Sequence, residues 1–314
     1  EYEYEDAEGL AKIKVIGVGG GGSNAVKRMI EANLEGVEFF VVNTDMQAIR
    51  ACRNAAQVPI GKNVTHGLGA GANPELGKRA AEEDKESLRK IVEGADMVFV
   101  TAGMGGGTGT GASPIIAELA RDAGALTISV VTRPFTFEGR KRARQAEEGI
   151  EELRQCADAQ IVIPNQRLID VVERKTPIKA AFRLADEVLL HGVKSISDLI
   201  VIPGEINLDF ADVRTIMKDT GVALMGIGVA TGDNRAQTAA ENAITSPLLE
   251  EASIEGATGV LVNVTGPSDM LLHELDDAMS VIYETVNEDA NVIFGLVYNC
   301  LLYTSPSPRD LSTS

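Results

Sequence analysis

The sequence predicts an α/β protein with a doubly wound parallel sheet, a long central helix and a second, smaller α/β domain. Apolar, β-branched segments of strand length alternate with segments of helical period along most of the 314 residues, as in parallel sheets joined by helical crossovers. Two of these strand segments run directly into glycine-rich stretches that precede helices. The length and the 44% hydrophobic content suffice for two buried cores.

The longest glycine-rich stretch is Gly103–Gly111. It follows the apolar segment 95–101 and precedes the segment 113–120, which predicts a helix with Pro114 in its first turn. Glycines let several backbone N–H groups converge on one anion, and the helix N-terminus adds partial positive charge. This arrangement predicts a phosphate cradle. A flexible glycine linker is the alternative, but linkers are seldom bracketed so closely by a strand and a helix.

A second glycine turn, residues 19–22, follows a predicted strand over 12–18 and opens a helix to about Leu34. Gly17, Gly19 and Gly22 also satisfy the dinucleotide fingerprint, and Asp45 after the next strand (37–43) stands where a ribose-binding acid would be expected. An NAD(P)-binding oxidoreductase is therefore a rival hypothesis. That hypothesis gives no role to the stretch Gly103–Gly111.

The stretch Gly105–Gly111 resembles the signature of the tubulin/FtsZ superfamily of GTPases, and residues 13–297 resemble the FtsZ cell-division family. The resemblance implies a tubulin-like fold, GTP or GDP as ligand, and Mg²⁺ bound mainly through the phosphates, with no metal-ligating residue predicted. The pattern of a P-loop is nowhere in the chain. The nucleotide-binding residues that the resemblance implies are Gly20, Gly21, Gly22, Ser23, Asn24, Gly103, Gly105, Gly106, Gly107, Thr108, Gly109, Glu138, Arg142, Asn165, Phe182 and Asp186.

The residues themselves permit several of these roles. Glu138 and Arg142 lie one helical turn apart, so they share a face, either as a surface ion pair or as ribose and phosphate contacts. Asn165 is expected to cap a short helix after the strand that ends at Pro164. Asp186 lies on a long helix predicted from Pro177 to about residue 200. A carboxylate accepts from both N1–H and the exocyclic amine of guanine, so Asp186 with Asn165 would select GTP over ATP; a solvated helix acid is the plainer interpretation.

Residues 61–73 contain four glycines and no helical period, which predicts a mobile loop. In the family it matches the segment that senses the γ-phosphate, with Ala70, Gly71 and Ala72 nearest. A plain surface loop is the alternative. One charged helix is predicted after it, from Pro74 to Val92.

Beyond the long helix, Asn207, Asp209 and Asp212 resemble the FtsZ loop whose acids enter the nucleotide site of the neighbouring subunit. By spacing alone, Asp209 and Asp212 would be acids at a helix N-terminus. The remaining chain predicts strands over 223–231, 259–265 and 291–297, and helices over 234–246 and 268–286.

The resemblance also sets the expected domains and partners. We expect an acidic disordered tail (1–10), a GTP-binding domain (11–176), a central helix (177–202), a truncated GTPase-activating domain (203–299) and a disordered, non-native tail (300–314). The expected partner is a second copy, added head to tail into filaments that scaffold the division ring at mid-cell. Other division proteins are expected too, although the usual C-terminal docking peptide is absent here.

The composition of the chain argues against several classes of ligand and site. The net charge of −17 argues against nucleic acid or an anionic membrane surface as a direct ligand. Three separated cysteines and three scattered histidines suggest neither disulfides nor a zinc site, which fits the cytoplasm. No apolar run has the length of a membrane span. A non-catalytic nucleotide-binding structural protein remains a further alternative to the GTPase.

Overall fold

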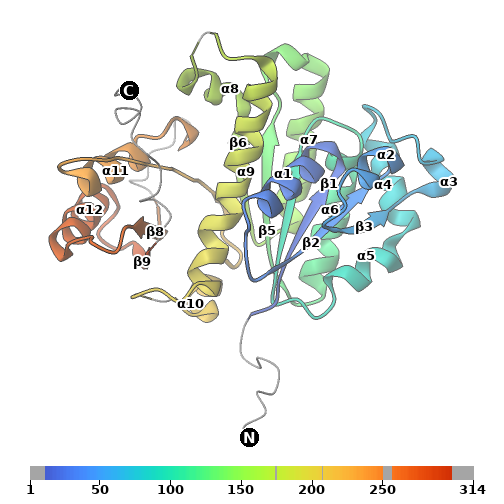
Figure 1. Cartoon of the computed structure of the whole chain (residues 1–314). Helices are drawn as coiled ribbons and strands as arrows, with labels where there is room; N and C mark the ends of the chain where they lie inside the picture. Colours follow the sequence, from blue (N-terminus) through green and yellow to red (C-terminus); the bar gives the residue numbers. More distant parts are fainter. Residues whose placement is uncertain (1–10, 174, 207, 250–256, 299–314) are drawn as a thin grey trace, which may run out of the picture. The chain divides into compact units, whose positions relative to one another are not determined.

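The computed structural model describes residues 11–173, 175–206, 208–249 and 257–298 (Figure 1). The chain forms two compact units that are not contiguous in sequence. Unit 1 takes the described residues of Glu1–Ser197, Met217–Gly226 and Pro247–Ala252, and unit 2 takes those of Asp198–Ile216, Ile227–Ser246 and Ser253–Ser314. The tails predicted at 1–10 and 300–314 lie outside the described residues.

Unit 1 is built on a seven-stranded, entirely parallel sheet with the strand order β3-β2-β1-β4-β5-β6-β7. This confirms the predicted fold class. The chain runs outward in both directions from the neighbours β1 and β4, as in doubly wound sheets. The strands are β1 (Ile13–Val18), β2 (Val37–Asn43), β3 (Ala56–Pro59), β4 (Met97–Gly103), β5 (Leu126–Arg133), β6 (Ala159–Pro164) and β7 (Gly221–Ala223).

Helices cover both faces of this sheet, which explains why its central strands are apolar on both sides. On one face, α6 packs against α4, α5 and α7, and Val98 and Val100 of β4 join their core. On the other, α1 packs against β1 and β4. The helices of unit 1 before α9 are α1 (Gly19–Glu31), α2 (Met46–Arg50), α3 (Lys62–Thr65), α4 (Pro74–Glu83), α5 (Lys85–Val92), α6 (Thr108–Asp122), α7 (Arg140–Cys156) and α8 (Asn165–Leu168), with 3-10 turns η1 (Thr136–Glu138) and η2 (Ile169–Val171).

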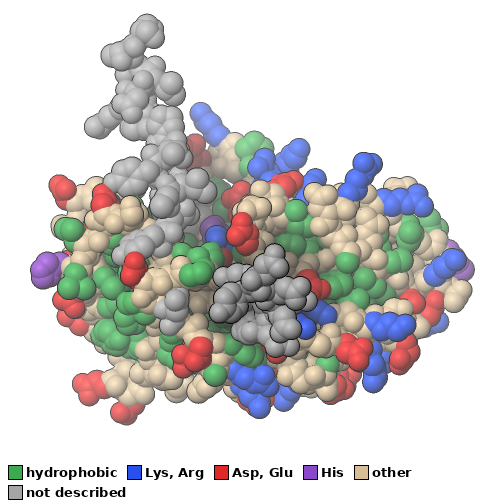
Figure 2. Space-filling view, turned by 60° about the horizontal axis from the view of Figure 1, so that its bottom comes forward, with side chains coloured by type: hydrophobic (Ala, Val, Ile, Leu, Met, Phe, Trp, Pro, Cys, Tyr) green, Lys and Arg blue, Asp and Glu red, His purple; other side chains and the backbone are tan. Residues whose placement is uncertain are grey.

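The long helix α9 (Ile178–Val201) has 24 residues, as the sequence predicts, and passes from unit 1 into unit 2 after Ser197 (Figure 1). It packs closely on β5, because a Cβ added at Gly192 would lie 2.8 Å from Cγ1 of Val130. No helix of the described chain is both long enough and apolar enough to cross a membrane. On the face in Figure 2, acidic side chains occur throughout, whereas basic side chains gather toward the middle and right of the view.

Three predicted elements differ from the structure. The single helix over 74–92 is two helices, since Asp84 leaves helical geometry and its carboxylate accepts from the backbone N–H of Gly61 (2.7 Å). The loop over 61–73 contains the short helix α3. The strand over 223–231 is instead the three-residue β7, which extends the sheet of unit 1.

Unit 2 contains the strands β8 (Gly259–Gly266) and β9 (Asn291–Tyr298), which pair in parallel. Its helices are α10 (Phe210–Met217), α11 (Arg235–Ile244) and α12 (Leu272–Thr285); the turn η3 (Pro247–Leu249) belongs to unit 1. In the described part of this unit, Met279, Ile282 and Val286 form the buried core cluster. Unit 2 is thus the smaller α/β unit that the sequence predicts.

Candidate nucleotide site

The two glycine-rich stretches lie at the point where the strand order reverses. One follows β1 and the other follows β4, and these strands are neighbours in the sheet. Ligands of open α/β sheets bind outside the carboxyl ends of the strands at such a point. The fold therefore brings together the two predicted phosphate-facing segments, which are about 80 residues apart in the chain.

The first stretch forms the opening turn of α1, in agreement with the predicted glycine turn that opens a helix. Gly19 has a left-handed backbone (φ 69°), and a Cβ at Gly22 would collide with the carbonyl oxygen of Thr101. Gly20 differs, because a Cβ there would meet no atom within 4 Å. Gly20 and Asn24 are exposed and one helical turn apart, so they present one open face of the turn.

The second stretch forms the opening turn of α6, which begins at Thr108 rather than near Ser113. Pro114, predicted in the first turn, is therefore inside the helix. A proline there removes one backbone hydrogen bond. The surrounding backbone is braced by side chains, since Ser113 Oγ donates to the Gly109 carbonyl (2.6 Å) and Thr110 Oγ1 accepts from the Gly105 N–H (2.8 Å).

The two helix starts face each other at close range. A Cβ at Gly19 would lie 2.8 Å from the nitrogen of Gly109, and one at Gly21 would lie 2.9 Å from the nitrogen of Gly103. Within the described residues, no side chain caps α1 or α6. First-turn N–H groups have no acceptor in their own helix, so both starts offer donors and partial positive charge to an anion.

Hydroxyl groups complete this cradle. Ser23 is buried, and its Oγ donates to the Gly19 carbonyl (2.6 Å). Thr44, at the end of β2, shares a hydrogen bond with Thr108 through the two Oγ1 atoms (2.7 Å). Thr44 is not among the predicted site residues; its position directly after the predicted strand 37–43 is the signal that points to it.

Asp45, the acid that the dinucleotide hypothesis would use to bind a ribose, contacts the backbone of α2 instead. Oδ1 of Asp45 accepts from the backbone N–H groups of Gln47 (2.8 Å) and Ala48 (3.3 Å) and so caps α2. A capping carboxylate is committed to its own helix. The structure thus weakens the oxidoreductase hypothesis.

Glu138 and Arg142 form an ion pair at 2.8 Å, as their spacing predicts. Glu138 lies in η1, and its other carboxylate oxygen accepts from the Phe135 N–H (2.9 Å). A Cβ at Gly106 would lie 3.8 Å from Nη2 of Arg142, and one at Gly105 would lie 2.7 Å from the Arg142 carbonyl. The guanidinium group of Arg142 therefore lies beside the glycine-rich stretch that follows β4.

Three phenylalanines gather near the start of α9. Phe135 and Phe137 stack with ring centroids 5.0 Å apart, and Phe182 contacts both rings edge-on at 5.3 and 6.2 Å. Phe137 is 60% exposed and Phe182 is 40% exposed. Exposed aromatic rings of this kind offer a face on which a flat ring can pack. Phe135 and Phe137 were not predicted as site residues.

Asn165 is buried as the first residue of α8, but it does not cap that helix as predicted. Its Oδ1 has no hydrogen-bond partner among the described residues. A buried amide oxygen without a donor costs free energy. A ligand that supplies an N–H group would remove that cost.

Asp186 is half-buried on α9. Burial raises the pKa of its carboxyl to about 6, while the charge of Arg28 on α1 acts to lower the pKa and Glu187 acts to raise it. A carboxyl at this pKa is mostly ionised at neutral pH and can accept two hydrogen bonds from one ligand edge. Arg28, whose charge favours that ionised form, was missed by the sequence analysis.

The loop after β3 closes one side of the cradle. The Gly71 carbonyl accepts from the Gly107 N–H (2.9 Å), and a Cβ at Gly107 would lie 2.9 Å from Cβ of Ala70.

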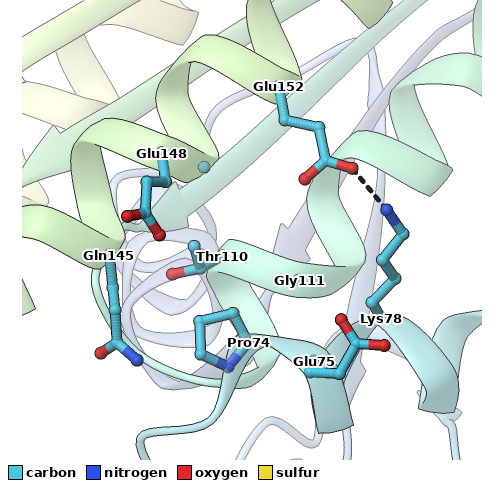
Figure 3. A pocket seen from close by; sticks show the side chains of 9 residues that line it. Pro74, Glu75, Lys78, Thr110, Gly111, Gln145, Glu148 and Glu152 are labelled. Carbon is cyan, nitrogen blue, oxygen red and sulfur yellow. Dashed lines mark hydrogen bonds and ion pairs between the residues drawn. The ribbon is translucent and has the colours of Figure 1, made fainter.

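Behind α6, a cavity of about 100 Å³ lies between α4, α6 and α7. Figure 3 shows its lining, which includes Gln145, Glu152 and Lys78; the last two form an ion pair at 2.6 Å.

The predicted acids lie in unit 2, apart from the unit that carries the glycines. Asp209 and Asp212 are exposed at the start of α10, and Oδ1 of Asp209 accepts from the Asp212 N–H (2.8 Å). Asp209 therefore has the structural role that its spacing suggests. Asn207 lies outside the described residues.

Comparison with known proteins decides the family. The model of the Tubulin/FtsZ family GTPase domain matches residues 12–173, and that of the FtsZ family C-terminal domain matches residues 221–302. An FtsZ structure from M. jannaschii is 42% identical, with a TM-score of 0.89 over 93% of this chain and 85% of that chain. The chain belongs to the tubulin/FtsZ family of GTPases.

More distant structures share the fold of this tubulin/FtsZ protein. CetZ1 from Haloferax volcanii is 23% identical with a TM-score of 0.78, and CetZ2 from the same organism is 20% identical with a TM-score of 0.77. Each alignment covers 92% of this chain and 90% of the other. Membership of a GTPase family accounts for a cradle of backbone donors at the switch point.

Proposed function

We propose that the chain binds GTP across the carboxyl ends of β1 and β4–β6 and hydrolyses it to GDP and phosphate when a second copy joins it head to tail. The observation that carries the proposal is the pair of uncapped helix starts, α1 and α6, whose first turns meet at the switch point. In a GTPase family, such a pair of starts suits the phosphates.

The order of the strands suggests how the nucleotide lies. Asn165 follows β6 and Glu138 follows β5, whereas the glycine-rich turns follow β4 and β1, and Gly71 follows β3. A nucleotide with its base near β6 would place its ribose beside Glu138. Its phosphates would then cross α6 and α1, and the outermost phosphate would lie toward the loops after β2 and β3.

The base end favours guanine. Ionised Asp186 would accept from N1–H and from the exocyclic amine, with Asn165 Oδ1 as a further acceptor and Phe182 packing on the ring. Adenine lacks this pair of donors, so it would leave a buried acceptor unpaired, at a cost of about 1–3 kcal/mol. The proposed ligand is therefore GTP rather than ATP.

The proposed chemistry is transfer of the γ-phosphoryl group to water. The attacking water would be polarised by Asp212, with Asp209 and Asn207 beside it, and its proton would leave with the products. First-turn N–H groups and Arg142 would stabilise the charge on the phosphates. Mg²⁺ prefers oxygen ligands and keeps several waters. In the described residues, no group of three or more His, Cys, Asp or Glu side chains could hold a metal ion. The proposed Mg²⁺ is bound mainly through the phosphates.

Self-association is supported by the relatives. The M. jannaschii structure is an FtsZ dimer, and the CetZ2 structure is a GTPγS-bound protofilament. Our proposal places the acids of one subunit against the nucleotide of the next, which is a heterologous contact and gives open filaments. The filament would serve as a cytoplasmic scaffold at the mid-cell division site, where other division proteins would join it.

The experiment combines binding with turnover. We expect GTP and GDP to raise the melting temperature of the full chain, with ATP and NAD(P) giving a much smaller shift at equal concentration. We expect phosphate release from GTP at concentrations that allow assembly. A shift with NAD(P) alone would favour the oxidoreductase, and assembly without phosphate release would favour a non-catalytic structural protein.

A further inference from the structure

Besides the cap that Asn73 makes on α4, three hydrogen bonds order the loop segment Ala70–Asn73. The Gly71 carbonyl accepts from the Gly107 N–H (2.9 Å), and the Ala70 carbonyl accepts from the Asn73 N–H (3.2 Å). The third bond comes from a side chain: Nε2 of Gln145, on α7, donates to the Ala72 carbonyl (3.1 Å) across 73 residues of sequence. Gln145 therefore connects this loop to a helix on the far side of α6.

The loop needs such a connection because its own backbone is loosely specified. Gly67, Gly69 and Gly71 all have positive φ angles, and a Cβ at Gly71 would meet no atom within 4 Å. Glycines lose more conformational freedom than other residues when they are ordered. The same segment faces the start of α6, where Gly107 has no room for a side chain.

Two features of the Gln145 amide limit what it contributes to stability. Its Oε1 is buried without a hydrogen-bond partner among the described residues, which costs free energy. The acceptor at Ala72 is on an exposed residue, which water can solvate instead. In Figure 3 the Gln145 side chain extends from α7 alongside the cavity, next to Pro74 at the start of α4.

We propose that Gln145 is a positioning residue that holds Ala70–Ala72 against the outermost phosphate and so makes the site prefer GTP to GDP. This inference rests on the proposed function. GDP lacks the phosphate that this loop would meet, so the hydrogen bond from Gln145 affects the affinity for GTP alone. The helix that carries Gln145 also carries Arg142, so α7 contacts both this loop and the glycine-rich stretch that follows β4.

The test is Gln145→Met in the full chain, which keeps the length of the side chain and removes both the donor and the buried oxygen. Dissociation constants for GTP and GDP are measured below the onset of assembly. We expect GTP binding to weaken about fivefold, the equivalent of one net hydrogen bond, with GDP binding changed less than about twofold. The melting temperature should stay level or rise, and hydrogen exchange should quicken in residues 66–73.

The matched control is Arg144→Met, the same replacement at the neighbouring, exposed position of α7, which should leave both affinities unchanged. An unchanged ratio of the two affinities in Gln145→Met would overturn the inference, as would an equal change in Arg144→Met. If Gln145→Met lowers the melting temperature, Gln145→Leu removes the same donor with different packing, and both variants must lower the ratio. Absence of GTP binding by the unmutated protein would overturn the proposed function as well.

Discussion

The two units of the chain hold their proposed functional residues in different ways. In unit 1 the residues lie at the ends of parallel strands, in a sheet whose core is covered on both faces. In unit 2, Asp209 and Asp212 are exposed at the start of the short helix α10, and the described core cluster is small. Our proposal therefore assigns nucleotide binding to unit 1, and it assigns to the exposed acids of unit 2 a contact with another molecule.

This difference implies that nucleotide binding and nucleotide turnover are separable. Changes at the strand ends of unit 1 should alter affinity, while changes at α10 should alter only the rate. Each of the following predictions tests one side of this comparison.

The largest expected effect is on turnover in unit 2. Asp212→Ala should lower GTP hydrolysis by at least about 100-fold, the usual contribution of a positioned acid or base. GTP binding and assembly should persist, because Asp212 lies outside unit 1. Phosphate release and a sedimentation assay measure the two properties on one sample.

The control for that variant is Asp233→Ala, which removes another exposed acid of unit 2 and should leave the rate unchanged. If Asp212→Ala hydrolyses GTP at the normal rate, α10 has no part in the chemistry. The proposed division of nucleotide binding and turnover between the two units would then be wrong.

The second largest expected effect is on the affinity of unit 1 for GTP. Gly20 is open to solvent in the first turn of α1, so Gly20→Asp should fold, and its carboxylate should be favourable at a helix N-terminus. It should nevertheless repel the phosphates and weaken GTP binding at least about tenfold. Isothermal titration calorimetry measures the affinity.

Gly20→Ala is the matched variant without charge. It should raise the free energy of unfolding by about 0.5 kcal/mol through helix propensity, and it should weaken GTP binding less than Gly20→Asp does. Equal GTP affinity in the aspartate variant and the unmutated protein would show that phosphates do not approach this turn.

The smallest effect concerns pH. With a pKa of about 6, Asp186 is about one-tenth ionised at pH 5 and about nine-tenths ionised at pH 7. GTP affinity should therefore rise by up to about tenfold over this range, in proportion to the ionised fraction, since the ionised form accepts both guanine donors. Asp186→Asn should flatten this dependence and reduce the preference for GTP over ATP.

As pH rises, the contribution of Asp186 to folding stability should fall, whereas GTP affinity should rise. The pKa of Asp186 is raised on folding, so the folded state holds its proton up to a higher pH than the unfolded chain does. The contribution of this group to stability is therefore greatest below its unfolded pKa and falls as pH rises through about 4 to 6. Asp186→Asn should raise the melting temperature at pH 7 relative to the unmutated protein. An equal pH profile for GTP binding in the two proteins would exclude Asp186 from the base site.

Much of the fold could be predicted because its signals are local. The strand over 37–43 matches β2, and the helix predicted from 177 to 200 matches α9 within one residue at each end. These segments have an apolar period that agrees with their burial. The glycine-rich turns were predictable because each stands between a strand and a helix.

The missed features depend on contacts between distant segments. Thr108–Gly111 has poor helix propensity, yet it begins α6, which packs so closely on α4 that a Cβ at Gly111 would collide with the Pro74 carbonyl oxygen. Asn165 follows a strand as a cap would, but its side-chain oxygen has no partner within the part of the chain that the structure describes. Neither the Thr44–Thr108 pair nor the bond from Gln145 to Ala72 has a sequence signal, since each joins residues more than 60 positions apart.

The central claim is that one subunit binds GTP and the next one activates it. Its most direct measurement is the rate of phosphate release per subunit as a function of protein concentration. We expect a rate near zero at low concentration, a rise at the concentration where assembly begins, and recovery of activity when Gly20→Asp and Asp212→Ala are mixed. A rate per subunit that is independent of concentration, and present well below assembly, would contradict it.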